Sequence, residues 1–160
     1  MEIRIATEAD LSQLVAVSEA ADSAAHWTYE QWQEIFQTEI PARLAWIAEE
    51  LTAQEELAVT HAVGFLVTQI GFPQNDAPDW ELENIAVLPE FRRRGLGREL
   101  LTALLARARL QGAQRILLEV RESNRGAIHL YEATGFQQLG RRRAYYVNPA
   151  EDALIMVHTL

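Results

Sequence analysis

"NIAVLPEFRRRGLGRELL", residues 84–101, decides the fold because it joins an apolar strand to a helix through an arginine-rich turn. The strand begins upstream, since "WELENIAVL" (80–88) has the composition of a sheet segment. From Arg94 to Gln111 the apolar residues return every three or four positions, which predicts an amphipathic helix, and Gly112 is suited to end it. We therefore expect helices packed on a sheet.

The turn itself has the composition of a phosphate site. Free backbone N–H groups and the positive dipole end at a helix N-terminus attract phosphate. Gly95 and Gly97 lack the Cβ atoms that would hold an anion away, and the neighbouring arginines can donate bidentate hydrogen bonds. The alternative is a charged, solvent-exposed helix start, and the spacing alone does not decide between the two.

The remaining segments predict strands and helices in mixed order. Thr7 and Thr28 are candidate helix caps, the first within a pattern close to a capping box. Residues 114–120 form a continuous apolar run, typical of a strand buried on both faces, and 72–79 are turn-rich, which predicts a surface loop. The expected strands are 2–6, 43–50, 57–71, 80–88, 114–120, 136–147 and 151–160, and the expected helices are 7–21, 28–40, 94–111 and 124–134. An apolar stripe on the second helix comprises Trp32, Ile35, Phe36 and Ile40.

Length and composition predict one domain over residues 1–160. The mixed order of strands and helices, β-α-β-α-β in the second half, predicts an α/β or α+β class with a mixed sheet. The 160 residues are 49% hydrophobic, enough for a single core. The absence of cysteine excludes disulfides, thiolate metal sites and a cysteine nucleophile, and the four histidines show no metal-ligand spacing. No apolar run reaches the roughly 18 residues of a membrane span, and the start of the chain does not resemble a signal peptide. We expect a cytoplasmic protein without a metal.

Charge is distributed unevenly along the chain. Residues 1–90 hold 17 acidic side chains against Arg4 and Arg43, whereas residues 91–160 hold 12 arginines against six acids, and lysine is absent. A solvated acidic surface is one explanation. The other is that the basic half meets an anionic ligand and the acidic half a cationic one. The net charge of −9 argues against a nucleic-acid partner.

Two long segments together carry a family resemblance. The opening stretch, followed by "ILLEVRESNRGAIHLYEATGF" (116–136), resembles the GNAT superfamily of N-acetyltransferases, whose Gln/Arg-x-x-Gly-x-Gly/Ala motif matches Arg92-x-x-Gly95-x-Gly97. "RRRAYY" (141–146) and "EDALIM" (151–156) are similar to the RimI-type ribosomal-protein-alanine N-acetyltransferases. The resemblance implies a mixed, mostly antiparallel sheet flanked by helices and splayed at the acetyl-CoA site. It also implies acetyl transfer to a protein N-terminus, that of a basic small-subunit ribosomal protein.

The resemblance also implies roles for individual residues. Glu119 matches the general base and Tyr131 the acid that protonates the CoA thiolate, while Tyr145 and Tyr146 would wall the peptide channel. The acetyl-CoA contacts carried over are Ile85, Ala86, Val87, Arg92, Arg93, Arg94, Gly95, Leu96, Gly97, Arg98, Asn124 and Tyr131.

Simpler roles exist for the same residues. Glu119 could be a solvent-facing strand glutamate, Tyr131 a core tyrosine, Asn124 a helix cap and the tyrosine pair ordinary sheet packing. Arg141, Arg142 and Arg143 are expected to form a solvated strand face; the alternative is that they touch the CoA 3′-phosphate.

The chemistry of acetyl transfer fits these roles. The acceptor amine must lose a proton, the carbonyl oxygen must be stabilised and the leaving thiolate must gain a proton. An α-amino group has a pKa of about 7.7–8.0 against about 10.4 for lysine, so a carboxylate is a sufficient base for an N-terminus. A phenol with an ordinary pKa of about 10 arrives protonated.

Other acceptors and other functions are compatible with parts of the same sequence. The same fold could acetylate a small-molecule amine or a lysine side chain, and Ala25-His26-Trp27-Thr28 stands where the branch carries Pro-Trp-Ser, in the region that shapes its acceptor groove. A non-catalytic CoA-binding module would not need Glu119 and Tyr131. An RNA-binding module would not be this acidic.

Overall fold

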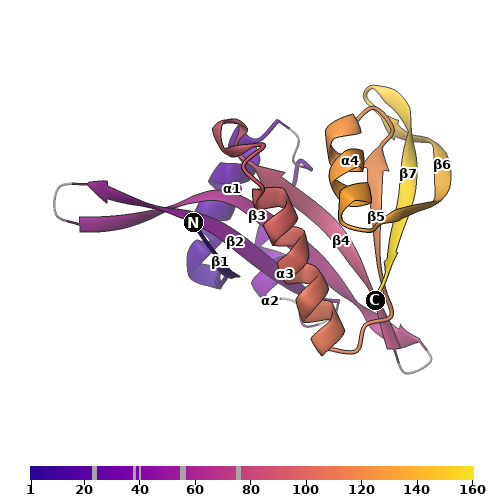
Figure 1. Ribbon diagram of the computed structural model, residues 1–160, viewed down its shortest axis with the longest axis horizontal. Helices are drawn as coiled ribbons and strands as arrows, with labels where there is room; N and C mark the ends of the chain where they lie inside the picture. Colours follow the sequence, from indigo (N-terminus) through magenta and orange to yellow (C-terminus); the bar gives the residue numbers. More distant parts are fainter. Residues whose placement is uncertain (23–24, 38, 40, 55–56, 75–76) are drawn as a thin grey trace.

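The computed structural model describes residues 1–22, 25–37, 39, 41–54, 57–74 and 77–160 (Figure 1). Within these residues the strands are β1 (Glu2–Ile5), β2 (Ala42–Gln54), β3 (Leu57–Gln74), β4 (Ala77–Val87), β5 (Arg115–Arg121), β6 (Gln137–Val147) and β7 (Ala150–Thr159). The helices are α1 (Leu11–Ala20), α2 (Tyr29–Gln37), α3 (Leu96–Leu110) and α4 (Arg125–Ala133), with 3₁₀ turns η1 (Glu8–Asp10) and η2 (Pro89–Phe91).

All seven strands belong to one sheet in the order β1-β2-β3-β4-β5-β7-β6. β4 and β5 are parallel, and the other neighbours are antiparallel. Helices α3 and α4 lie on one face of the sheet and α1 and α2 on the other (Figure 1). The expected mixed, mostly antiparallel sheet flanked by helices is therefore confirmed.

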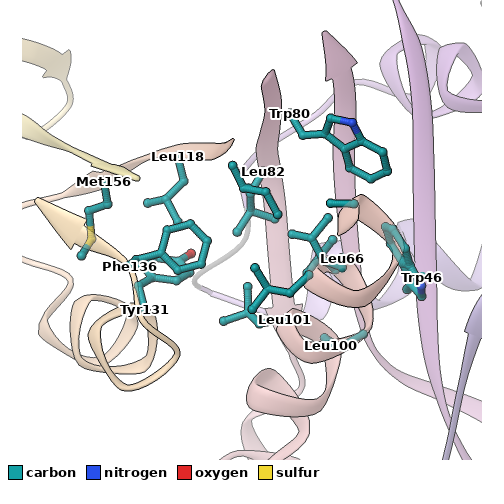
Figure 2. Packing of buried hydrophobic residues seen from close by; sticks show 14 of the residues in the cluster. Trp46, Leu66, Trp80, Leu82, Leu100, Leu101, Leu118, Tyr131, Phe136 and Met156 are labelled. Atoms are coloured by element: carbon teal, nitrogen blue, oxygen red, sulfur yellow. The ribbon is translucent and has the colours of Figure 1, made fainter. Parts of the chain in front are cut away.

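Each face of the sheet has its own apolar core, because neighbouring residues of a strand point to opposite faces. Trp46 and Leu66 face α3, whereas Ile47 and Phe65 face α1 and α2. The core under α3 and α4 includes Trp46, Leu66, Trp80, Leu82, Leu100, Leu101, Leu118, Tyr131, Phe136 and Met156 (Figure 2). The opposite core includes Leu14, Val17, Trp32, Ile35, Ile47, Phe65, Val67 and Ala86.

The parallel pair β4 and β5 separates part of the way along. In the described register, pairing runs from Asp79 opposite Arg115 to Leu82 opposite Leu118. Beyond that point β4 continues to Val87 along β3, and β5 continues to Arg121 along β7. The expected splay is therefore present in the register.

A β-bulge lies where the two strands part. Leu82 and Asn84 oppose the consecutive β3 residues Thr68 and Val67, so Glu83 is an extra residue in β4. The extra residue changes which face the strand presents. Leu82 packs in the core under α3, whereas Ala86 packs in the core under α1 and α2.

Local helix signals are confirmed at both predicted caps. Thr7 and Asp10 form a capping box, although the first turn is the 3₁₀ turn η1. Thr28 accepts a hydrogen bond from Gln31 N–H at 3.3 Å, and Gln31 Oε1 accepts from Thr28 N–H at 2.8 Å. On α2, Trp32 and Ile35 are buried as the stripe predicts, and Phe36 is partly buried against the same core. Ile40 lies outside the described residues.

Two predictions about strands are wrong. Residues 72–74 and 77–79 are not a surface loop: β3 continues to Gln74, β4 begins at Ala77, and Pro73 pairs with Pro78. Residues 75–76 lie outside the described residues. β2 pairs with β3 only as far as Ala42 opposite Ile70, so this end of β3 has an open side on which proline costs no ladder hydrogen bond. Residues 114–120 are not buried on both faces, since β5 alternates and its outer face is only partly covered.

Candidate active site

The predicted phosphate turn leads directly into α3. Gly95 is the residue before the helix and has φ +91°, in the left-handed region that glycine enters without strain. Arg93 also has a positive φ, +61°, which is uncommon for a residue with a side chain. The first N–H groups of α3 have no partner within the helix. The backbone thus turns sharply and presents a helix N-terminus that fits a diphosphate.

Three of the arginines near this turn contact the protein itself. Arg92 donates through Nε to the Val87 carbonyl at 3.1 Å and forms an ion pair with Asp22. Arg94 lies over the Phe91 ring, 4.9 Å from its centroid. Arg98 donates to the carbonyl of Ala133, the last residue of α4, at 3.2 Å. Their expected contact with phosphate stays a prediction.

The packing of α3 against α4 also requires glycine at position 97. A Cβ atom at this position would lie 2.9 Å from Leu130 Cδ2 on α4, so the glycine lets the two helices approach closely. Asn124 caps α4, because its side-chain oxygen accepts from Ala127 N–H at 3.1 Å. Leu96 is buried beneath the turn. These residues fix the turn and both helix starts on one side of the sheet.

The main chain of β4 faces the opening between the strands. Leu88 N–H donates to the Val63 carbonyl at 2.9 Å. The alternation of an antiparallel ladder then directs the N–H and C=O groups of Ile85 and Val87 away from β3, to the side that β5 has left. Ala86 bonds toward β3 instead. This orientation favours the predicted contact of Ile85 and Val87 with an acyl-pantetheine arm.

Glu119 lies on β5, one residue past the last pair with β4. Its carboxylate Oε1 is 2.8 Å from Arg142 Nε, and 20% of the side chain is exposed. The hydrogen bond to Glu119 and the negative charge of its carboxylate raise the pKa of the Tyr145 phenol. Glu119 is therefore not a bare solvent-facing glutamate but the centre of a small polar network.

Tyr131 approaches the separated strands from the opposite side. It lies on α4, packs beside Phe136 with ring centroids 5.8 Å apart, and is 6% exposed (Figure 2). Burial, together with the nearby phenol of Tyr146, raises the pKa of Tyr131 above its ordinary value. The group is thus held protonated, as an acid requires.

An irregularity in β6 presents the two tyrosines. Arg142 pairs with Ala153 and Tyr146 with Glu151, so three β6 residues oppose Asp152 alone. Asp152 accepts from Ala144 N–H at 2.8 Å and from Arg141 at 3.0 Å, which holds the bulge.

The two tyrosine rings meet edge to face. Their centroids are 5.2 Å apart, and Arg121 lies 3.9 Å from the centre of the Tyr146 ring. Tyr145 is exposed and Tyr146 half-buried. The paired rings stand beside Glu119, where an acceptor wall was expected.

Two further carboxylates of β4 extend the polar network. Partial desolvation, then the charges of Glu83 and Glu119, raise the pKa of Glu81. Glu83 is paired with Arg43, whose Nε lies 2.7 Å from Glu83 Oε2. A small cavity next to this pair is lined by Trp27, Gln31, Glu34, Arg43 and Glu83. The alternation of Glu81 and Glu83 in an apolar strand was the sequence signal for this cluster, but their partners were not predictable.

Asn84 was missed at the sequence level. It is 5% exposed, accepts from Ala25 N–H at 3.1 Å and donates to the Ala25 carbonyl at 3.2 Å. These two hydrogen bonds fix the start of the segment Ala25-His26-Trp27-Thr28 against β4. The segment that departs from the family pattern is therefore attached beside the opening.

Other kinds of site find little support in the described part of the chain. No group of three or more His, Asp or Glu side chains there is arranged to hold a metal ion. None of the helices in the described residues is long and apolar enough to cross a membrane. Arg141, Arg142 and Arg143 are exposed, as expected of a solvated face. Two of them also form ion pairs, Arg142 with Glu119 and Arg141 with Glu122 and Asp152.

Known protein families and individual proteins are similar to this chain in sequence. The sequence model of the family described as acetyltransferase (GNAT) matches residues 14–136. A [ribosomal protein bS18]-alanine N-acetyltransferase of Salmonella typhimurium is 42% identical over 109 residues, which cover 67% of each protein. The enzyme of the same description from Escherichia coli K12 is 48% identical over 77 residues, 47% of this chain and about half, 52%, of that protein.

A solved structure resembles the whole chain. The crystal structure of the ribosomal-protein-S18-alanine N-acetyltransferase from Escherichia coli superposes with a TM-score of 0.76 at 31% identity. The superposition covers 99% of this chain and 92% of the other. The likeness therefore includes the first 80 residues, where the motifs are weakest.

Proposed function

This chain belongs to the acetyltransferase (GNAT) family, and on that premise we propose that it transfers an acetyl group from acetyl-CoA to the N-terminal α-amino group of a protein. The proposed acceptor is the N-terminal alanine of a ribosomal protein, the substrate named for the Salmonella and Escherichia coli relatives. A cytoplasmic location follows from such an acceptor. Residues 1–160 would act as one domain, because β1 and β6 are the two edges of one sheet.

The observation that carries the proposal is the placement of Glu119 and Tyr131 at the separation of β4 and β5. Glu119 follows the last β4–β5 pair on the partly exposed face of β5, whereas Tyr131 comes from α4 on the other side of the sheet. A thioester held between the strands would have a carboxylate on one side and a phenol on the other. Direct transfer needs this arrangement, because the base meets the amine and the acid meets the leaving sulfur.

Acetyl-CoA would supply the thioester acetyl group. The turn at Gly95 and the first N–H groups of α3 would hold the diphosphate, and Ile85 and Val87 would bond to the pantetheine arm. Glu119 would take a proton from the α-ammonium, which frees the nitrogen lone pair to attack the carbonyl carbon. As the C–S bond breaks, Tyr131 would give its proton to the sulfur and regain one from the acylated nitrogen, which becomes the amide. No covalent enzyme intermediate is needed.

The proposal is tested with three acceptors and acetyl-CoA. These are a basic peptide that starts with alanine, an Nα-blocked peptide containing lysine, and a polyamine, each analysed by mass spectrometry. We expect one acetyl group on the α-amine of the first peptide and none on the other two acceptors. Acetylation confined to the blocked peptide or the polyamine would identify a lysine or small-molecule acetyltransferase instead.

A further inference from the structure

The guanidinium of Arg142 already contacts the carboxylate of Glu119, the candidate base. Arg142 on the edge strand β6 reaches across β7, so that its Nε lies 2.8 Å from Glu119 Oε1 on β5. The two partners differ in exposure: 55% of the Arg142 side chain is accessible against 20% for Glu119. The guanidinium of Arg142 is thus held by the carboxylate, while more than half of the side chain is accessible to solvent.

The surroundings of the pair favour a positive charge. The carboxylate of Glu81 on β4 is close enough to be repelled by Glu83 and Glu119 and attracted by Arg142, as the direction of its pKa shift reflects. Arg43 is occupied with Glu83. The ring of Tyr145 lies 5.3 Å below the Arg142 guanidinium, a distance at which an aromatic face attracts a cation. Two carboxylates and a ring therefore surround one position, and Arg142 fills it.

An amine acceptor needs the same position. A general base must lie within hydrogen-bond reach of the proton it takes, at about 2.6–3.2 Å between heavy atoms. An α-amino group is largely an ammonium at neutral pH, so it arrives at Glu119 as a second cation. Two cations next to one carboxylate repel each other. In addition, Tyr145 already donates a hydrogen bond to Glu119, so fewer acceptor positions of this carboxylate remain.

We propose that the guanidinium of Arg142 occupies the position that the ammonium of the acceptor takes, and that the acceptor binds by displacing it. This inference rests on the proposed function for the identity of Glu119 as the base, but it holds for any cationic amine. The displaced side chain is already more than half exposed, so it can turn into solvent without breaking a core contact. The exchange makes a positive charge on the acceptor a condition for good binding.

Replacement of Arg142 tests the inference. If Arg142 competes with the acceptor for Glu119, removing its side chain should improve the apparent affinity for the acceptor by the factor by which the competition had weakened it. In Arg142→Ala we therefore expect the KM and the calorimetric Kd for the alanine-starting basic peptide, with CoA bound, to fall by roughly two- to fivefold, the range of an exposed ion pair. The KM for acetyl-CoA should stay within about twofold of the wild type, because the turn at Gly95 is untouched, and Arg142→Lys should resemble the wild type.

A small guanidinium compound that fills the vacated position gives a second measurement, which would not change if Arg142 had only a structural role. Ethylguanidinium should compete with the peptide in Arg142→Ala more strongly than in the wild type. Arg143→Ala is the matched control, because Arg143 is the next residue of β6, is exposed and acts on Asp152. Its constants should equal those of the wild type.

Any other pattern overturns the inference. A raised or unchanged peptide Kd in Arg142→Ala would show that Arg142 does not compete with the acceptor, and a loss of kcat would show that it is needed during transfer. Failure of the proposed function is a separate result. If the wild type acetylates lysine or a polyamine instead, the same comparison is made with that amine.

Discussion

At the scale of single residues, Glu119 is the side chain on which the proposed chemistry depends most. Glu119→Gln keeps the size of the side chain and a contact to Arg142 but removes the proton acceptor. We expect kcat to fall by about 10²–10⁴, the usual contribution of a positioned base. Acetyl-CoA affinity, measured by calorimetry, should stay near the wild-type value because the turn at Gly95 is untouched.

A matched control lies three residues further along the chain. Glu122 is also paired with an arginine, Arg141 at 2.7 Å, but on the surface. Glu122→Gln should leave kcat unchanged. If both variants were equally active, Glu119 would not be the base, and Glu81, whose pKa is raised by burial, would be the next candidate.

Tyr131 predicts a feature of the pH profile. Burial raises the pKa of the Tyr131 phenol above its ordinary value of about 10, so the folded protein keeps this proton well into the alkaline range. The kcat should therefore show no decline between about pH 7 and about pH 9 from loss of that proton. Tyr131→Phe, which keeps the packing against Phe136, should lower kcat at every pH in this interval. A normal kcat in Tyr131→Phe would remove the phenol from the mechanism.

At the scale of elements, the start of α3 combines backbone geometry with ligand binding. Gly95 has φ +91°, and Gly112, just beyond the same helix, has φ +72° with open space where a Cβ would lie. Alanine at either site should lower the free energy of unfolding by about 1–2 kcal/mol, the cost of a left-handed residue. Only Gly95→Ala should also weaken acetyl-CoA binding in a calorimetric titration. Equal acetyl-CoA affinities in the two variants would contradict the phosphate role of the turn.

The sequence is informative about elements wherever one residue pattern governs one element. The leucine periodicity of α3 and the caps Thr7 and Thr28 led to correct helices, because these signals act within a few residues. Strand ends were less predictable. Pro73 and Pro78 favour a loop locally, yet they pair across the β3–β4 hairpin because one side of the hairpin end is open.

Sequence analysis named Glu119, Tyr145 and Tyr146 in the acceptor half of the candidate site, but for a related reason it did not predict the contacts among the residues there. The bulge at Glu83 and the bulge opposite Asp152 depend on register between strands distant in sequence, so no local pattern reports them. The contact of Arg142 with Glu119 follows from that register. By contrast, the ligands proposed for acetyl-CoA lie within two continuous motifs, which is why the sequence alone could name them.

At the scale of the whole molecule, one polar clamp joins the first strand to the rest of the sheet. Arg4 on β1 pairs with Asp10 in η1 and with Glu49 on β2, each at 2.8 Å. The two carboxylates are buried, at 8% and 5% side-chain exposure. The hydrogen bond from Arg4, supported by Thr7, holds the pKa of Asp10 well below its ordinary value despite burial.

This clamp predicts how stability depends on pH. Because the folded-state pKa of Asp10 is depressed, its contribution is complete above the unfolded value of about 3.9 and is lost as pH falls through the folded value. Asp10→Asn should therefore lower the free energy of unfolding by about 1–3 kcal/mol at neutral pH, measured by urea denaturation. The difference from the wild type should shrink below about pH 4. Glu122→Gln removes an exposed pair and should cost no more than about 1 kcal/mol at neutral pH. An Asp10→Asn deficit that stayed constant down to about pH 2 would mean that packing, not the charge on Asp10, ties β1 to the sheet.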